Sequence, residues 1–248
     1  MRNTLTEMKP HEVKEGKFNK VIFGIGSTES HGEHMPMGTD GMIAHGLAKN
    51  IADQFNDILL LPPVMYGVSE HHKNFDFTLY IQAETMINML KDIFASIHNR
   101  GITKIIVVNG HDGNIAPIEI AARAYKMSHP LVSILTLPSW WENLDAILPE
   151  GTLSEWNGGH GGETETSMGM ALFPELIDLS YAKTMIPKLK NSQVMEMKWS
   201  FSEISTVGSV GYPDRANPEK AKLIMEVLVS KASEYIRYLD EMDWKYSV

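Results

Sequence analysis

The stretch Lys104-Ile105-Ile106-Val107-Val108-Asn109-Gly110-His111-Asp112-Gly113-Asn114 decides the fold. It starts as a compact apolar run, passes through a glycine-rich turn, and leads into residues 115–127, whose pattern is typical of a helix. A short run that is apolar at nearly every position, rather than at alternate positions, indicates a strand covered on both faces, as in a parallel sheet. Three further runs share this character: Val21–Ile25, Ile58–Leu61 and Val132–Leu137.

Helix-like segments separate these runs. Four of them show apolar residues at helical spacing, namely 42–55, 85–99, 115–127 and 163–172. A final helix follows Asn217, a good N-cap, and Pro218, which suits the first helical position. The alternation of strands and helices predicts the α/β class, as a single domain over residues 1–248 with a mainly parallel central sheet in a three-layer α/β/α arrangement.

Composition narrows the function. The chain has 248 residues and a formal charge of −9, from 31 acidic and 22 basic side chains, which argues against a nucleic-acid partner. It has no cysteine but ten histidines, so a transition-metal site would have to use imidazole and carboxylate ligands. No signal peptide and no run of about 20 apolar residues is present, so we expect no membrane partner and a cytoplasmic location.

The first strand leads into Gly24-Ile25-Gly26-Ser27-Thr28-Glu29. A dinucleotide-binding fingerprint needs a third glycine where Glu29 stands, and a carboxylate there would repel a pyrophosphate. This loop therefore predicts something other than a Rossmann site.

Glu29, His31 and Asp40 follow the first strand within twelve residues. Residues two apart in an extended backbone point to the same side, so Glu29 and His31 can face one cavity. Carboxylate and imidazole together suit zinc, manganese or iron(II). The alternative is a polar loop in which Asp40 only caps a helix and His31 lies at the surface. His111 favours the metal site, because loops at the carboxyl ends of neighbouring parallel strands converge on one crevice.

A third histidine loop runs Gly158-Gly159-His160-Gly161-Gly162-Glu163 and continues to Glu165. His160 and Glu163 could supply a catalytic base and a further metal ligand. Alternatively, Glu163 and Glu165 only favour the N-terminus of the following helix through its dipole. The spacing does not separate these interpretations.

These residues resemble a known family, the creatininase (creatinine amidohydrolase) family. Three runs carry the resemblance: Gly26-Ser27-Thr28-Glu29-Ser30-His31-Gly32-Glu33-His34-Met35-Pro36-Met37-Gly38-Thr39-Asp40, Asn109-Gly110-His111-Asp112-Gly113-Asn114, and His160-Gly161-Gly162-Glu163-Thr164-Glu165-Thr166-Ser167. The resemblance implies a creatininase-like α/β fold with a dinuclear metal site, hydrolysis of C–N bonds in amides or cyclic amides, and commonly a hexameric assembly.

The resemblance also implies roles for individual residues. It makes Glu29 and His111 ligands of one metal, His31 a ligand of the other, Asp40 the bridge, and His160 the catalytic histidine. Creatininase has a glutamate ligand at the position of Gly113, and we expect Glu163 to replace it. The residues that the resemblance places at the substrate are Ser69, His72, Phe77, Thr78, Trp140 and Trp156. Phe77 stands where the family often has a glycine, which argues against creatinine itself as the substrate.

The prediction is therefore a metal-dependent amidohydrolase with two divalent ions per chain, Zn²⁺, Mn²⁺ or Fe²⁺. It would cleave a C–N bond of a small cyclic or heteroaromatic amide with a metal-activated water, as a homo-oligomer. Three alternatives remain open: a formamide hydrolase (deformylase) acting on a pyrimidine intermediate, a hydrolase of a cyclic ketone, and a noncatalytic homologue that binds a metal or another ligand.

Overall fold

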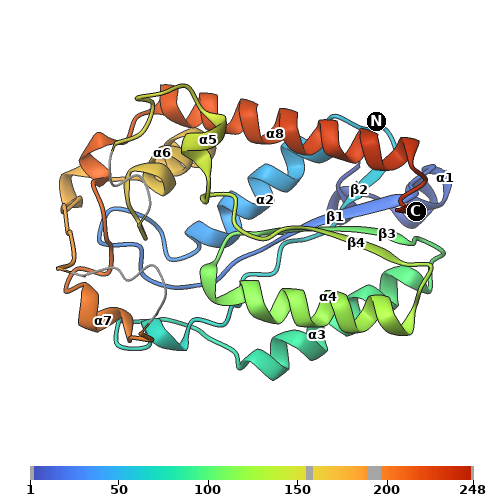
Figure 1. Cartoon of the computed structure of the whole chain (residues 1–248), viewed down its shortest axis with the longest axis horizontal. Coiled ribbons are helices and arrows are strands. Elements are labelled where there is room, and N and C mark those ends of the chain that lie inside the picture. The colour runs from blue at the N-terminus through green and yellow to red at the C-terminus, as the bar shows by residue number, and fades with distance from the viewer. Residues whose placement is uncertain (1–2, 155–158, 189–196, 247–248) are drawn as a thin grey trace.

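The computed structural model describes residues 3–154, 159–188 and 197–246. Its centre is a four-stranded, fully parallel sheet of order β2-β1-β3-β4 (Figure 1). The strands are β1 (Lys20–Ile25), β2 (Ile58–Leu60), β3 (Lys104–Asn109) and β4 (Ser133–Leu137). All four apolar runs thus form the strands of one sheet, and the predicted α/β class is confirmed.

Helices cover both faces of the sheet (Figure 1). One layer contains α2 (Thr39–Ala52), α6 (Glu163–Leu172) and α8 (Pro218–Glu241), which contact one another. The other contains α3 (Ala83–His98) and α4 (Ile115–Ser128), packed side by side. Shorter elements complete the described chain: α1 (Pro10–Glu15), α5 (Leu144–Ile147), α7 (Phe201–Ile204), and the 3₁₀ turns Leu5–Glu7, Glu70–His72, Asp112–Asn114, Pro174–Leu176, Leu179–Tyr181 and Pro213–Arg215.

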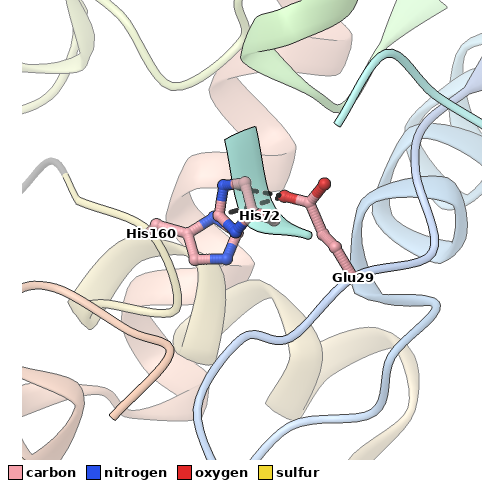
Figure 2. A group of neighbouring side chains, drawn as sticks. All are labelled: Glu29, His72 and His160. Atoms are coloured by element: carbon pink, nitrogen blue, oxygen red, sulfur yellow. Dashed lines mark ion pairs between the residues drawn. The ribbon is translucent and has the colours of Figure 1, made fainter. Parts of the chain in front are cut away.

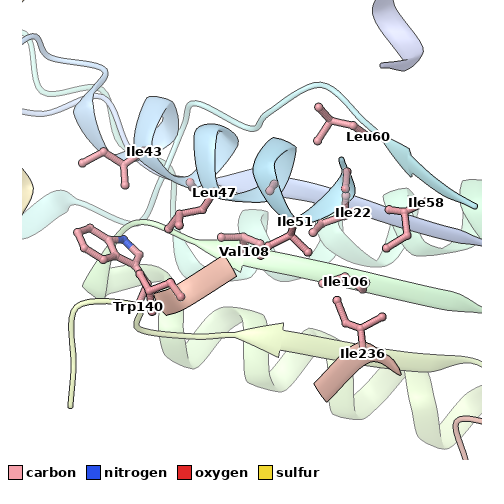
Figure 3. Close-up of a cluster of buried hydrophobic side chains, with 14 of the residues drawn as sticks. Ile22, Ile43, Leu47, Ile51, Ile58, Leu60, Ile106, Val108, Trp140 and Ile236 are labelled. Atoms are coloured by element: carbon pink, nitrogen blue, oxygen red, sulfur yellow. The ribbon is translucent and has the colours of Figure 1, made fainter. Parts of the chain in front are cut away.

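Each strand divides its side chains between two hydrophobic cores. On β3, Ile106 and Val108 belong to the core under α2 and α8, which Figure 3 shows, whereas Ile105 and Val107 pack toward α3 and α4. Because successive side chains of a strand point to opposite faces, a run that is apolar at every position requires both layers of helices. β1 pairs with β3 in register from Lys20 opposite Lys104 to Ile25 opposite Asn109, and this pairing sets the positions where the carboxyl ends of the two strands open into loops.

The longest helix begins as its sequence predicts. The side chain of Asn217 accepts a hydrogen bond from the Lys220 amide at 2.9 Å, and Pro218 occupies the first helical position. Within the described residues, no helix combines the length and apolar character needed to cross a membrane.

Candidate metal centre

The carboxyl ends of β1 and β3 bring two polar loops together. Ile25 pairs with Asn109 across the sheet, and the next amide, that of Gly110, donates to the Ile25 carbonyl at 2.8 Å. The loop that follows β1 and the turn that follows β3 therefore start side by side. Four predicted ligands meet there, each at most 3% exposed: Glu29, His31, Asp40 and His111.

Asp40 lies between two histidines. Its Oδ1 is 2.7 Å from His31 Nε2, and its Oδ2 is 3.1 Å from His111 Nδ1. Asp40 lies in the first turn of α2, whose N-cap is Gly38, so its carboxylate does not cap the helix. One carboxylate that presents an oxygen to each of two imidazoles is arranged as a bridge between two cations would be.

Backbone carbonyls fix the orientation of three imidazole rings. His31 Nδ1 donates to the Glu29 carbonyl at 3.2 Å, His111 Nε2 donates to the Val68 carbonyl at 3.2 Å, and His160 Nε2 donates to the Ser30 carbonyl. Since a carbonyl only accepts, the proton of each neutral ring lies on that nitrogen. The other nitrogen then turns its lone pair toward the carboxylates, as in the outer shell of a metal site.

The buried carboxylates have too few donors around them. Both oxygens of Glu29 and Oδ2 of Asp40 are buried without a hydrogen-bond partner. Three groups of ligand atoms, each within 4.8 Å of one another, lie here: Glu29 with His31 and Asp40, Glu29 with His72 and His160, and His31 with His160 and Glu165. Buried carboxylates that face imidazole lone pairs require positive charge between them, and this donor set suits divalent transition metals.

In the metal-free protein, protons would supply that charge. Burial disfavours charge on His31, but the Asp40 carboxylate outweighs it and raises the pKa of His31 to about 9. Glu29 raises the pKa of His111 well above its ordinary value against the same opposing effect of burial. Burial would raise the pKa of Glu29, yet the neighbouring imidazoles hold it well below the usual range. The cluster is thus built around two carboxylates that stay ionised.

His160 and His72 cover the outer side of Glu29 (Figure 2). Their ring nitrogens lie 3.7 and 3.5 Å from Glu29 Oε1, from His160 Nδ1 and His72 Nε2 respectively. Burial lowers the pKa of His160 to about 3, so the ring is neutral near pH 7. Because Nε2 is held by the Ser30 carbonyl, Nδ1 is the nitrogen left to exchange a proton at the site.

Two acidic side chains at the start of α6 have different surroundings. Glu165 Oε2 lies 3.8 Å from His31 Nε2 and accepts from the Gly161 amide at 2.6 Å, whereas Glu163 pairs with Lys220 and accepts from Ser154. The Glu163 carboxylate is therefore paired away from the cluster, and its expected role as a ligand or catalytic group stays a prediction. Glu165 contacts His31 in its place.

The chain matches the creatininase family (creatinine amidohydrolase) over residues 6–236. This chain belongs to the creatininase family. A creatinine amidohydrolase of Pseudomonas putida is 26% identical over 236 residues, 88% of each chain. A 3-dehydro-scyllo-inosose hydrolase of Thermotoga maritima is 30% identical over 172 residues, which cover 68% of this chain and 55% of its own. Creatininase with manganese superposes with a TM-score of 0.79 at 24% identity, covering 96% of this chain and 98% of that one.

The position of Gly113 is closed in this member of the creatininase family. A Cβ atom built there would lie 2.1 Å from the Val68 carbonyl oxygen and 2.8 Å from His111 Nε2. Those are contacts with backbone and with a ring held in place, so neither can move aside cheaply. The local backbone thus leaves no room for a side-chain ligand at position 113. A carboxylate ligand for a second metal ion would have to come from another residue.

We expect Gly113→Ala to lower the free energy of unfolding by about 2 kcal/mol, because overpacking at a rigid position costs roughly 1–3 kcal/mol. It should also lower metal content, since the new methyl group displaces His111. Thermal melting and elemental analysis measure the two effects. Gly38→Ala is the control, because its Cβ would meet only the flexible side chains of Met65 and Met42, the nearest atom at 3.1 Å. Equal melting temperatures for both variants would contradict the prediction.

Three of the residues expected at the substrate, Ser69, Thr78 and Phe77, have two kinds of surroundings. Ser69 and Thr78 form hydrogen bonds with neighbouring residues of the site loops: Ser69 accepts from Ser27 at 2.8 Å, and Thr78 donates to the His72 carbonyl at 3.0 Å. Phe77 is 84% exposed, with a left-handed φ of 57°, and its ring is directed to solvent. Neither arrangement tests binding, so these roles remain predictions.

The two tryptophans expected to form walls of the substrate site are placed differently. Trp140 is 1% exposed and packs in the core between the sheet and α8 (Figure 3), an environment that does not favour its predicted stacking on a substrate, which stays a prediction. Trp156 lies outside the described residues.

Sequence reasoning missed an aromatic cover over the histidines. Phe201, in α7, stacks on His72 at 4.2 Å between ring centroids and lies 4.8 Å from His160. Trp199 lies 6.0 Å from Phe201 and is 37% exposed. These residues stand about 40 positions beyond the last histidine motif and form no motif with it. The sequence therefore carried no signal that would bring them to the site.

His34 is a second missed residue. It is buried, and its Nε2 donates to the Gly161 carbonyl at 3.1 Å, which ties the first loop to the loop that carries His160. Burial lowers the pKa of His34 to about 4, so the ring is neutral and acts as a structural donor. His34 lies within the first motif, at residues 26–40, which could have marked it as a residue of the site. The motif alone does not predict which residues His34 contacts.

Proposed function

We propose that this creatininase-family hydrolase is a metal-dependent amidohydrolase that cleaves a C–N bond in a small cyclic or heteroaromatic amide. Two divalent ions, Zn²⁺, Mn²⁺ or Fe²⁺, would be held per chain. Glu29 and His111 would bind one ion, and His31 and Glu165 the other, with Asp40 between them. The observation that supports this most strongly is the set of buried, unpartnered oxygens of Glu29 and Asp40 that face imidazole lone pairs.

Two bound divalent ions would polarise a substrate carbonyl and lower the pKa of water from 15.7 toward about 7. The chain supplies the proton transfer. His160 is neutral near pH 7, and its Nδ1 faces the cluster, so it can take a proton from the attacking water and deliver it to the leaving nitrogen. The Ser30 carbonyl stabilises the protonated ring, since it still accepts from Nε2–H after Nδ1 has gained its proton.

The aromatic cover favours a flat substrate. Phe201 and His72 are buried and already stack on each other with an interplanar angle of 21°, so Trp199, which is 37% exposed beside Phe201, presents the aromatic face that remains open to a substrate. Aromatic faces of this kind bind planar rings by offset stacking, worth about 0.5–1.5 kcal/mol beyond burial. A planar cyclic amide would present its carbonyl to the ions while its ring contacts this surface.

Metal analysis combined with a hydrolysis screen tests the proposal. The protein, purified without chelator, should contain two metal equivalents per chain and hydrolyse members of a panel of cyclic amides in the presence of Mn²⁺, Zn²⁺ or Fe²⁺. The panel should include formamides and lactones as comparisons. Zero or one equivalent, with no turnover of any compound, would instead favour a noncatalytic binding protein. Turnover confined to formamides would favour the deformylase alternative.

Removing the metal should destabilise the protein. A ligand present at about 100 times its Kd stabilises the folded state by about 2.7 kcal/mol. Two bound ions should therefore raise the melting temperature of a chain of this size by roughly 10–20 °C. Thermal melts with and without a chelator, followed by readdition of Zn²⁺ or Mn²⁺, measure this. A chelated sample that melts at the same temperature would count against a resident metal centre.

A further inference from the structure

The two proposed ions leave one group of ligand atoms unused. Glu29, His72 and His160 face one another on the outer side of the centre (Figure 2), and their ligand atoms lie within 4.8 Å of one another. His72 Nε2 lies 3.5 Å from Glu29 Oε1, and His160 Nδ1 lies 3.7 Å from the same oxygen. The proposed reaction uses His160 for proton transfer and gives the nitrogens of His72 no role.

His72 differs from the other imidazoles of the centre in its hydrogen bonding. His31, His111 and His160 each donate to a backbone carbonyl. His72 is only 2% exposed, yet its Nδ1 is buried without a hydrogen-bond partner among the described residues. Its Nε2 faces Glu29 at 3.5 Å, beyond the range of about 2.7–3.2 Å that is usual for a hydrogen bond. A buried imidazole without a strong partner costs free energy, and this one is directed at a carboxylate.

The spacing of the three side chains fits a zinc ion. Bonds of about 2.1 Å at the tetrahedral angle place the ligand atoms of zinc about 3.4 Å apart. The distances of 3.5 and 3.7 Å from Glu29 Oε1 to the nitrogens of His72 and His160 are close to this separation. Two imidazoles with one carboxylate are also a ligand set that zinc uses in enzymes. Such a set binds Zn²⁺ more tightly than Mn²⁺, because affinity rises along this series of metals.

Neighbouring contacts hold the three side chains in place before an ion binds. Phe201 stacks on His72 with 4.2 Å between ring centroids. The Ser30 carbonyl accepts from His160 Nε2, so the lone pair on Nδ1 is directed at Glu29. Both oxygens of Glu29 lack a hydrogen-bond partner in the described part of the chain, and a carboxylate offers about four lone pairs. Glu29 can therefore bind the ion at His111 and a further ion together.

We propose that Glu29, His72 and His160 form a third cation site, which takes up Zn²⁺ when zinc is in excess and blocks the reaction. The block rests on the proposed function, because it requires His160 to carry the proton. A zinc ion on His160 Nδ1 occupies the lone pair that would accept the proton from water, so proton transfer stops. Because the third ion adds positive charge beside two bound cations, this site fills after the other two.

Zinc counting at controlled free Zn²⁺ tests the site. The protein is dialysed against buffers of rising free Zn²⁺, and elemental analysis should show a third equivalent binding after the first two. His72→Phe keeps a ring against Phe201 but removes both nitrogens. It should weaken the third equivalent at least about 100-fold, since loss of an outer-shell partner alone costs about 10–100-fold in metal affinity. His71→Asn changes the neighbouring histidine, which is outside the group, and should bind zinc as the parent does.

The same titration separates this inference from the proposed function. Fewer than two equivalents in the first stage would count against the two-ion centre, whereas only the zinc that depends on His72 measures the third site. Zinc binding that is equal in the parent and in His72→Phe, at any stoichiometry, would overturn the third site. If circular dichroism shows that His72→Phe does not fold, His160→Asn removes the other nitrogen ligand and should lose the same equivalent. Retention of that equivalent in His160→Asn would also overturn the site.

Turnover provides a second measurement. Hydrolysis of the best substrate from the screen should fall at least about tenfold as the third equivalent binds, with its midpoint at the Kd of that ion. The same concentrations of Mn²⁺ should leave the rate unchanged, because manganese binds this ligand set more weakly. A constant rate while the third zinc equivalent binds would overturn the block.

Discussion

Asp40→Asn should lower the metal content from two ions per chain to at most one and reduce kcat/KM by at least about 1,000-fold. One oxygen of the Asp40 carboxylate contacts His31 and the other contacts His111, so in the proposed centre this group would lie between the two metal ions. An amide has no negative charge and only one ligand oxygen, so it cannot replace the bridge. Loss of metal activation removes several kcal/mol of transition-state stabilisation, which corresponds to this factor.

The control for that experiment lies on the same helix. Asp53 ends α2, is exposed, and forms an ion pair with Lys49 at 2.7 Å. Asp53→Asn should keep both metal content and turnover, because an exposed pair of this kind contributes at most about 1 kcal/mol to stability. Elemental analysis and rates on the best substrate from the screen decide the comparison. Full metal content and full activity in Asp40→Asn would refute the bridging role.

Two substitutions at the start of α6 should have different effects, one on metal content and activity and the other on stability. Glu165→Gln should reduce the metal content to about one ion per chain and lower kcat/KM by about 100-fold or more, because the carboxylate next to His31 is lost. Glu163→Gln should keep both ions. It should instead lower the free energy of unfolding by about 2 kcal/mol, because Lys220 loses the buried carboxylate with which it forms an ion pair.

Elemental analysis and thermal melting, performed on both variants, separate the two roles. The variants serve as each other's control, because each replaces one carboxyl group by an amide in the same turn of the same helix. A Glu163→Gln protein that lost an ion while Glu165→Gln kept both would restore the expectation drawn from the sequence. Loss of an ion in both variants would mean that the loop carrying His160 must be held in place before the second ion can bind.

The sequence was sufficient to predict the parallel sheet and most of the residues that meet at the carboxyl ends of β1 and β3. The apolar runs predict strands because burial on both faces leaves no position for a polar side chain, and β1 and β3 occur where this pattern places them. Parallel pairing then brings the loop with Glu29, His31 and Asp40 next to His111 without further information. Strand ends are local properties, and the convergence of neighbouring loops follows from them.

The remaining features depend on helix rotation and on distant packing. Glu163 and Glu165 are two residues apart on α6, so their side chains point about 200° away from each other, and the phase of the helix decides which one faces His31. That phase is set by contacts of α6 with α2 and α8, which no local pattern encodes. The burial of Trp140 has a similar origin, because the turn after β4 directs its ring into the core.

The carbonyls that hold the three imidazoles belong to the main chain, at Glu29, Ser30 and Val68. A main-chain oxygen is present whatever side chain its residue carries, so the aim of these rings does not depend on the identity of Ser30 or Val68. Substitutions of Ser30 or Val68 should therefore leave the orientation of His160 and His111 unchanged. Such a scaffold suits directed evolution: libraries built on the aromatic cover, Trp199 and Phe201, should yield new substrate ranges more readily than loss of metal.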